Sequence, residues 1–99
     1  MKQVTAEQLK TLLEENPNLY LIDVREEHEH SEFNIGGILT PLSELFNHVV
    51  EIPKDEPVVV YCKMGIRSQI AIQRLEQRYQ FSNLVNLQGG IEAWKHASR

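Results

Sequence analysis

The sequence contains a single cysteine, Cys62, among its 99 residues. One thiol cannot form an internal disulfide, and it excludes both a Cys-x-x-Cys redox motif and a zinc site built from cysteines. Any chemistry at Cys62 is therefore the chemistry of one thiol. A lone cysteine also fits a reducing compartment, and the first ten residues lack the apolar segment of an export signal, so we expect a cytoplasmic protein.

Other absences exclude further classes of protein. No apolar run approaches the roughly 20 residues that cross a bilayer, so we expect no membrane partner. The net charge is −4 without a cluster of lysine and arginine, which argues against nucleic acid as a partner. The composition, 41% hydrophobic and 24% charged, is ordinary for a globular protein. We expect residues 1–99 to form one domain, because two halves would each be too small for a useful core.

Segments that resemble strands and helices alternate along the chain. Thr5 and Gln8 predict a capping box for a helix that begins near Ala6, and Pro17 ends that helix. Near-continuous apolar runs of strand length are typical of a parallel sheet covered by helices on both faces. Such runs occupy residues 19–24, Val58–Tyr61 and Leu84–Leu87.

The segments between these runs read as helices and turns. Residues 26–33 predict a helical turn, and Gly36 and Gly37 permit a close backbone approach before a short strand. Thr40 is expected to cap a helix that starts with Pro41 and continues to residue 49. Further helices are predicted from near Ser68 and over residues 91–96, the latter with a tryptophan on its apolar side.

The segment after the strand at Val58–Tyr61 combines a thiol, a flexible position and two cations. It reads Cys62-Lys63-Met64-Gly65-Ile66-Arg67-Ser68. Inward backbone N–H groups, the positive end of the next helix and the two basic side chains would all favour a thiolate. The alternative is a cysteine that serves only as a small buried hydrophobe. The composition of this loop favours the first alternative, in which Cys62 is a nucleophile.

Three motifs in the same order resemble the rhodanese-like family. They are residues 21–25 (LIDVR), residues 62–68 and residues 86–94 (NLQGGIEAW). Asn34 and Ile38 depart from the family pattern, which has a histidine and a small residue there. The resemblance implies a three-layer α/β fold with a central, mainly parallel sheet, and a thiosulfate sulfurtransferase without a cofactor. The Cys62 thiolate would take sulfur from a donor such as thiosulfate, and the persulfide would pass it to cyanide or a thiol.

The resemblance also implies roles around the thiol. Lys63 and Arg67 would attract the thiosulfate dianion, and the loop N–H groups around Gly65 would stabilise the anionic persulfide. Arg67 has an alternative role in an ion pair with Asp23 or a glutamate. The remaining loop and support positions are Met64, Ile66, Ser68, Asp23 and Arg25. For Met64 and Ile66 the alternatives are a wall of the donor pocket and packing against neighbouring elements.

Three other interpretations compete. His28, Glu29 and His30 could suggest a metal, but their spacing on a helix favours a solvated charged face, so no metal site is expected. A cysteine phosphatase is disfavoured, because only four residues separate Cys62 from Arg67, one fewer than in that loop. The third interpretation, a persulfide carrier that serves a protein donor or acceptor, remains open. Without a second cysteine, the acceptor must be external in either case.

Overall fold

The computed structural model describes residues 1–97. It contains a 5-stranded sheet in the order β1-β5-β4-β2-β3, and every pair of neighbouring strands is parallel. The strands are β1 (Lys2–Val4), β2 (Tyr20–Asp23), β3 (Ile38–Leu39), β4 (Val58–Tyr61) and β5 (Leu84–Leu87). The helices are α1 (Ala6–Glu15), α2 (Glu27–Glu32), the 3-10 helix η1 (Leu42–Glu51), α3 (Ile66–Tyr79) and α4 (Gly90–His96). The predicted α/β class with a parallel sheet is confirmed.

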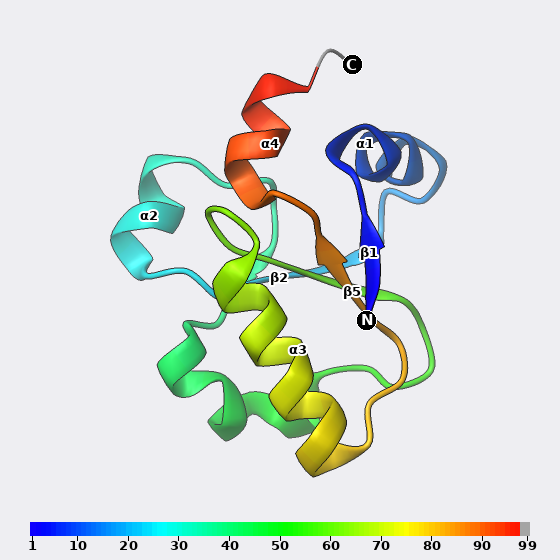
Figure 1. Cartoon of the computed structure of the whole chain (residues 1–99), viewed down its shortest axis with the longest axis vertical. Helices are drawn as coiled ribbons and strands as arrows, with labels where there is room; N and C mark the ends of the chain where they lie inside the picture. The colour runs from blue at the N-terminus through cyan, green and yellow to red at the C-terminus, as the bar shows by residue number, and fades with distance from the viewer. Residues whose placement is uncertain (98–99) are drawn as a thin grey trace.

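Helices cover both faces of the sheet, because successive strand side chains point to opposite sides. Val58 and Val60 of β4 join one buried cluster, on the side where α3 lies beside η1. Val59 and Tyr61 join a second cluster, on the side where α1 lies beside α4 (Figure 1). The three layers place an apolar core on each side of β4, which explains why this strand is apolar throughout.

The carboxyl ends of the inner strands meet at one edge of the sheet. Asp23 at the end of β2 is paired with Tyr61 at the end of β4, and Val60 is paired with Asn86 of β5. In open parallel sheets, ligand sites lie beyond this edge. The segments that begin with Arg25 and Cys62 therefore lie where a functional site is expected.

The first helix forms as predicted. Gln8 donates its backbone N–H to Thr5 Oγ1 at 3.1 Å, and Thr5 donates its N–H to Gln8 Oε1 at 2.9 Å, so both partners of the capping box are present. The strand β1 before it was not predicted, since it is only three residues long and two of them are exposed. This strand is formed by its parallel pairing with β5, a contact that the local sequence does not show.

Two predicted helix starts are wrong. The helix α3 begins at Ile66 rather than near Ser68, because Gly65 adopts a left-handed conformation with φ 91° and starts the helix directly. Thr40 does not cap η1; Pro41 holds the cap position without a side-chain hydrogen bond. The reason is that Thr40 N–H donates to Asp23 O at 2.8 Å, which keeps Thr40 extended beside β2.

The predicted close approach at the paired glycines occurs at Gly37. A Cβ there would lie 2.6 Å from the Tyr61 ring, whereas a Cβ at Gly36 would meet nothing within 4 Å. Asn34 shapes the same turn, since its Oδ1 accepts the Gly36 N–H at 2.8 Å. Within residues 1–97, no helix is long and apolar enough to cross a membrane.

Candidate active site

The thiol of Cys62 lies at the centre of a loop that turns its backbone N–H groups inward. Cys62 directly follows β4, and only 1% of the residue is exposed. Gly65 donates its N–H to Cys62 Sγ at 3.1 Å, and Ser68 donates its N–H at 3.4 Å. Ser68 lies in the first turn of α3, so the positive end of the helix dipole also faces the sulfur. The loop geometry expected for an anion cradle is present.

A buried polar chain supports the sulfur from the side of β5. Ser68 Oγ lies 3.4 Å from Cys62 Sγ and 2.5 Å from Asn86 Oδ1, to which it donates. Asn86 Nδ2 in turn donates to Gln3 Oε1 at 3.1 Å. Both Ser68 and Asn86 are fully buried. The hydroxyl can thus turn its proton to the amide oxygen or to an anionic sulfur.

The closing Gly-Gly motif positions the backbone of the loop. A Cβ at Gly90 would lie 2.4 Å from Cys62 O, so only glycine permits this approach. The next residues then bind the loop carbonyls: Ile91 N–H donates to Cys62 O at 2.9 Å, and Glu92 N–H donates to Lys63 O at 3.0 Å. The loop is thereby tied to the start of α4.

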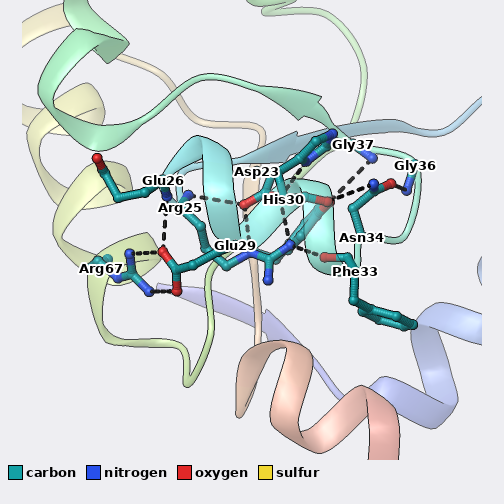
Figure 2. A network of polar contacts seen from close by, with 11 residues as sticks. Asp23, Arg25, Glu26, Glu29, His30, Phe33, Asn34, Gly36, Gly37 and Arg67 are labelled. Carbon is teal, nitrogen blue, oxygen red and sulfur yellow. Dashed lines mark hydrogen bonds and ion pairs between the residues drawn. The ribbon is translucent and has the colours of Figure 1, made fainter.

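Arg67 forms an ion pair with a residue of α2. Its Nη1 and Nη2 donate to the two carboxylate oxygens of Glu29 at 2.8 and 2.9 Å (Figure 2). These hydrogen bonds lower the pKa of Glu29 to about 2. Of the two roles expected for Arg67, the ion pair is therefore present, with Glu29 and not Asp23 as its partner. The expectation that Glu29 lies on a solvated face is wrong, because Glu29 contacts a cation 38 residues away.

Asp23 and Arg25 form a second buried ion pair beside the loop. Arg25 donates from Nε at 3.0 Å and from Nη2 at 2.8 Å to Asp23, and His30 Nδ1 lies 2.8 Å from the same carboxylate. Burial alone would raise the pKa of Asp23, but the hydrogen bonds from Arg25 and His30 outweigh it and lower that pKa. Arg25 Nη2 also donates to Phe33 O at 2.6 Å. This pair anchors the segment between β2 and α2.

A small cavity opens on the thiol. Its volume is about 160 Å³, and it is lined by Cys62, Lys63, Met64, Ile66 and Arg67. Met64 is 62% exposed and Ile66 is 64% exposed, so these side chains form an apolar rim and do not pack into the core. Lys63 is exposed and makes no ion pair within the described part of the chain. The cavity suits a donor of a few atoms next to one unpaired cation.

Sequence reasoning missed two residues that shape this site. Asn86 carried a weak signal, since it is a polar residue inside the apolar run of β5, three residues before the Gly-Gly turn. For Glu29 the sequence suggested only that some glutamate could pair with Arg67, because the contact depends on where α2 lies relative to α3. His28 is exposed. Among residues 1–97, no cluster of histidine, cysteine and carboxylate side chains is arranged to hold a metal ion.

Known proteins resemble this chain over nearly its whole length. The family model for the rhodanese-like domain matches residues 5–97. The probable adenylyltransferase/sulfurtransferase MoeZ of Mycobacterium tuberculosis is 36% identical over 94 residues, which cover 92% of this chain but 24% of MoeZ. The chain thus spans about a quarter of that relative's length. The thiosulfate sulfurtransferase GlpE of Coxiella burnetii is 33% identical over 79 residues, which cover 79% of this chain and 73% of GlpE.

Comparison with solved structures points to the same family as the comparison of sequences. The crystal structure of a rhodanese-like domain protein from Staphylococcus aureus has a TM-score of 0.86 at 29% identity, with 95% of this chain and 91% of that chain covered. Strands β2 to β5, the loop after β4 and the Gly-Gly motif at the start of α4 all lie inside the matched residues. The chain therefore belongs to the rhodanese-like domain family, whose curated relatives include proteins named as sulfurtransferases.

Proposed function

We propose that this protein is a sulfurtransferase that carries a sulfane sulfur as a persulfide on Cys62. The observation that supports this most is the convergence of two backbone N–H groups on Cys62 Sγ, at 3.1 and 3.4 Å. Donors aimed at one sulfur stabilise negative charge there, both on the thiolate and on the persulfide. We also propose that the 99 residues act as one domain with this single site.

Thiosulfate is the proposed small donor. The Cys62 thiolate attacks its outer sulfur, the sulfur–sulfur bond breaks, and sulfite leaves with the electron pair. A thiol or cyanide then attacks the bound sulfur, and Cys62 leaves as a thiolate. Lys63 would attract the dianion. Arg67 contributes less positive charge than its sequence position suggests, because Glu29 already neutralises it.

The test combines loading with turnover. After incubation with thiosulfate, the mass of the protein should rise by one sulfur, and added cyanide should release thiocyanate. Cys62→Ser should abolish both results, whereas Ser43→Ala, a change at an exposed serine in η1, should leave both intact. Thiocyanate formation at the normal rate by Cys62→Ser would disprove the proposal. Hydrolysis of a phosphate ester that depends on Cys62 would instead favour a phosphatase.

A second candidate function is that of a persulfide carrier for a protein partner. The apolar rim of Met64 and Ile66 favours it, because two exposed hydrophobic side chains beside a nucleophile are typical of a docking surface. In that case the double variant Met64→Ser/Ile66→Ser should slow transfer from a persulfidated donor protein. Its rate with thiosulfate and cyanide should change little. Equal effects on both donors would argue for the small-molecule enzyme.

A further inference from the structure

A chain of hydrogen bonds runs from the edge of the sheet to the buried thiol. Its members are Gln3 of β1, Asn86 of β5, Ser68 of α3 and Cys62. Gln3 lies directly opposite Asn86 in the parallel pairing of β1 with β5 (Figure 1). Gln3 is exposed, whereas the other three members are buried. It also lies outside residues 5–97, which the family model matches, and the proposed reaction gives it no task.

Gln3 fixes the direction of the hydrogen bonds in this chain. An amide side chain has an oxygen that accepts and a nitrogen that donates. Asn86 Nδ2 donates to Gln3 Oε1 at 3.1 Å, so Asn86 presents its oxygen to Ser68. The Ser68 hydroxyl donates to that oxygen at 2.5 Å. The one proton of the hydroxyl is therefore directed away from the sulfur, which lies 3.4 Å from Ser68 Oγ.

This direction offers less to an anionic sulfur than the reverse direction would. A hydroxyl oxygen whose proton is engaged elsewhere can accept from a thiol, whereas a hydroxyl that donates to the sulfur stabilises a thiolate. The two backbone N–H groups that reach the sulfur belong to Gly65 and Ser68 and do not depend on the direction of the chain. The Ser68 hydroxyl is thus the adjustable donor at the thiol.

Reversal of the chain requires a change at Gln3. If the Asn86 amide turned its nitrogen to Ser68, its oxygen would face Gln3 Oε1, and two acceptors would oppose each other. A glutamine can turn its own amide and donate instead. A glutamate only accepts and would hold the direction seen here, whereas a lysine only donates and would impose the reverse.

We propose that Gln3 is a positioning residue of the sulfur site, which acts through Asn86 on the Ser68 hydroxyl and so sets how readily Cys62 becomes a thiolate. The inference rests on the proposed function, in which that thiolate is the nucleophile. Gln3 touches neither the sulfur nor a substrate; it acts through two buried side chains.

The test compares Gln3→Glu with Gln3→Lys by the rate at which iodoacetamide alkylates Cys62, at a pH where this rate still rises with pH. We expect the lysine variant to react about fivefold faster, because a larger thiolate fraction is partly offset by lower nucleophilicity. Both variants should fold, since residue 3 is exposed. The same two changes at Gln73, an exposed glutamine of α3, are the matched control and should alter the rate little.

A second pair of proteins separates hydrogen bonding from charge. The two Gln3 variants are repeated with Ser68→Ala, which removes the hydroxyl and keeps the new charges as well as Lys63 and Arg67 of the cavity. We expect the fivefold difference to shrink to less than about twofold, as a double-mutant cycle measures. An equal difference with and without the hydroxyl would show a charge effect alone and would overturn the proposal. Equal rates for the first two variants would also overturn it.

Loading with thiosulfate connects this result to the reaction. The Gln3→Lys variant should gain sulfur faster than Gln3→Glu, and this order should depend on Ser68 in the same way. Loading rates that do not depend on Ser68 would overturn the proposed role in sulfur transfer. If none of the proteins gains sulfur, the proposed function fails, whereas the alkylation rates still decide whether Gln3 acts on the thiol, because alkylation needs no sulfur donor.

Discussion

Glu29 of α2 holds Arg67 of α3 through two hydrogen bonds of 2.8 and 2.9 Å. The guanidinium lines the cavity around the thiol, yet its charge is matched by a carboxylate. Lys63 is consequently the one cation lining that cavity without an ion pair in the described chain. Arg67 thus ties α3 to α2, and under the proposed function the unpaired charge that would attract a substrate belongs to Lys63.

Replacing Glu29 should change how the protein recognises an anionic donor. Glu29→Gln leaves Arg67 unpaired beside the cavity, so we expect the KM for thiosulfate to fall about twofold to fivefold while kcat changes little. Steady-state kinetics at low ionic strength measures this. Glu27→Gln, an exposed neighbour in α2, is the control. A higher KM in Glu29→Gln would mean that the ion pair positions Arg67 for the donor.

The same ion pair makes stability depend on pH. The pKa of Glu29 is lowered from 4.5 to about 2 by the hydrogen bonds from Arg67. The pair therefore contributes stability above pH 4.5, and this contribution is lost as the pH falls toward about 2. We expect Glu29→Gln to reduce the free energy of unfolding by up to about 1 kcal/mol at pH 7. Urea denaturation between pH 7 and pH 3 should show the difference shrinking at acidic pH.

Ser68→Ala should affect both stability and turnover. The change leaves Asn86 Oδ1 buried without its donor, which costs about 1–3 kcal/mol. The backbone N–H groups of Gly65 and Ser68 still reach the sulfur, so turnover should fall by about tenfold and not be abolished. Denaturant unfolding and thiocyanate formation measure the two effects. Loss of stability with unchanged turnover would show that the hydroxyl only supports Asn86.

Two glycines with nearly the same positive φ should differ in their tolerance of alanine. Gly65 and Gly36 have φ 91° and 93°, so each substitution introduces left-handed strain of about 1–2 kcal/mol. At Gly65 the new Cβ would also lie 3.1 Å from Gly89 N, whereas at Gly36 it would meet nothing within 4 Å. Gly65→Ala should therefore destabilise more and should also slow sulfur loading. Equal losses in thermal unfolding would show that the close approach is unimportant.

Local patterns predicted most of the elements because their signals are short in range. The capping box of Thr5 and Gln8 formed within four residues, and β4 and β5 have the predicted bounds. The start of α3 was misjudged for a local reason, the left-handed Gly65, whereas two other errors arose where a distant contact set the conformation. Thr40 stays extended because it binds Asp23 O, and β1 forms only because β5 lies beside it.

The same division applies to the candidate site. The residues of the loop from Cys62 to Ser68 and the Gly-Gly motif were all named from sequence, because the left-handed glycines and the strand-to-helix turn are encoded locally. An ion pair of Arg67 with Asp23 or a glutamate was expected, but the choice of Glu29 was not, since a glutamate on α2 becomes a neighbour of Arg67 only after both helices pack on the sheet. Nor could the sequence indicate that Ser68 of α3 donates a hydrogen bond to Asn86 of β5.

By itself, the sequence determined the family, the class of fold and the thiol at the end of β4, because motifs and apolar periodicity act over a few residues. Only the tertiary structure decided how charge is distributed around that thiol. It paired Arg67 with Glu29 and Asp23 with Arg25, and it left Lys63 without an ion pair among residues 1–97. The physical reason is that ion pairs depend on distances of a few ångströms between elements far apart in the chain.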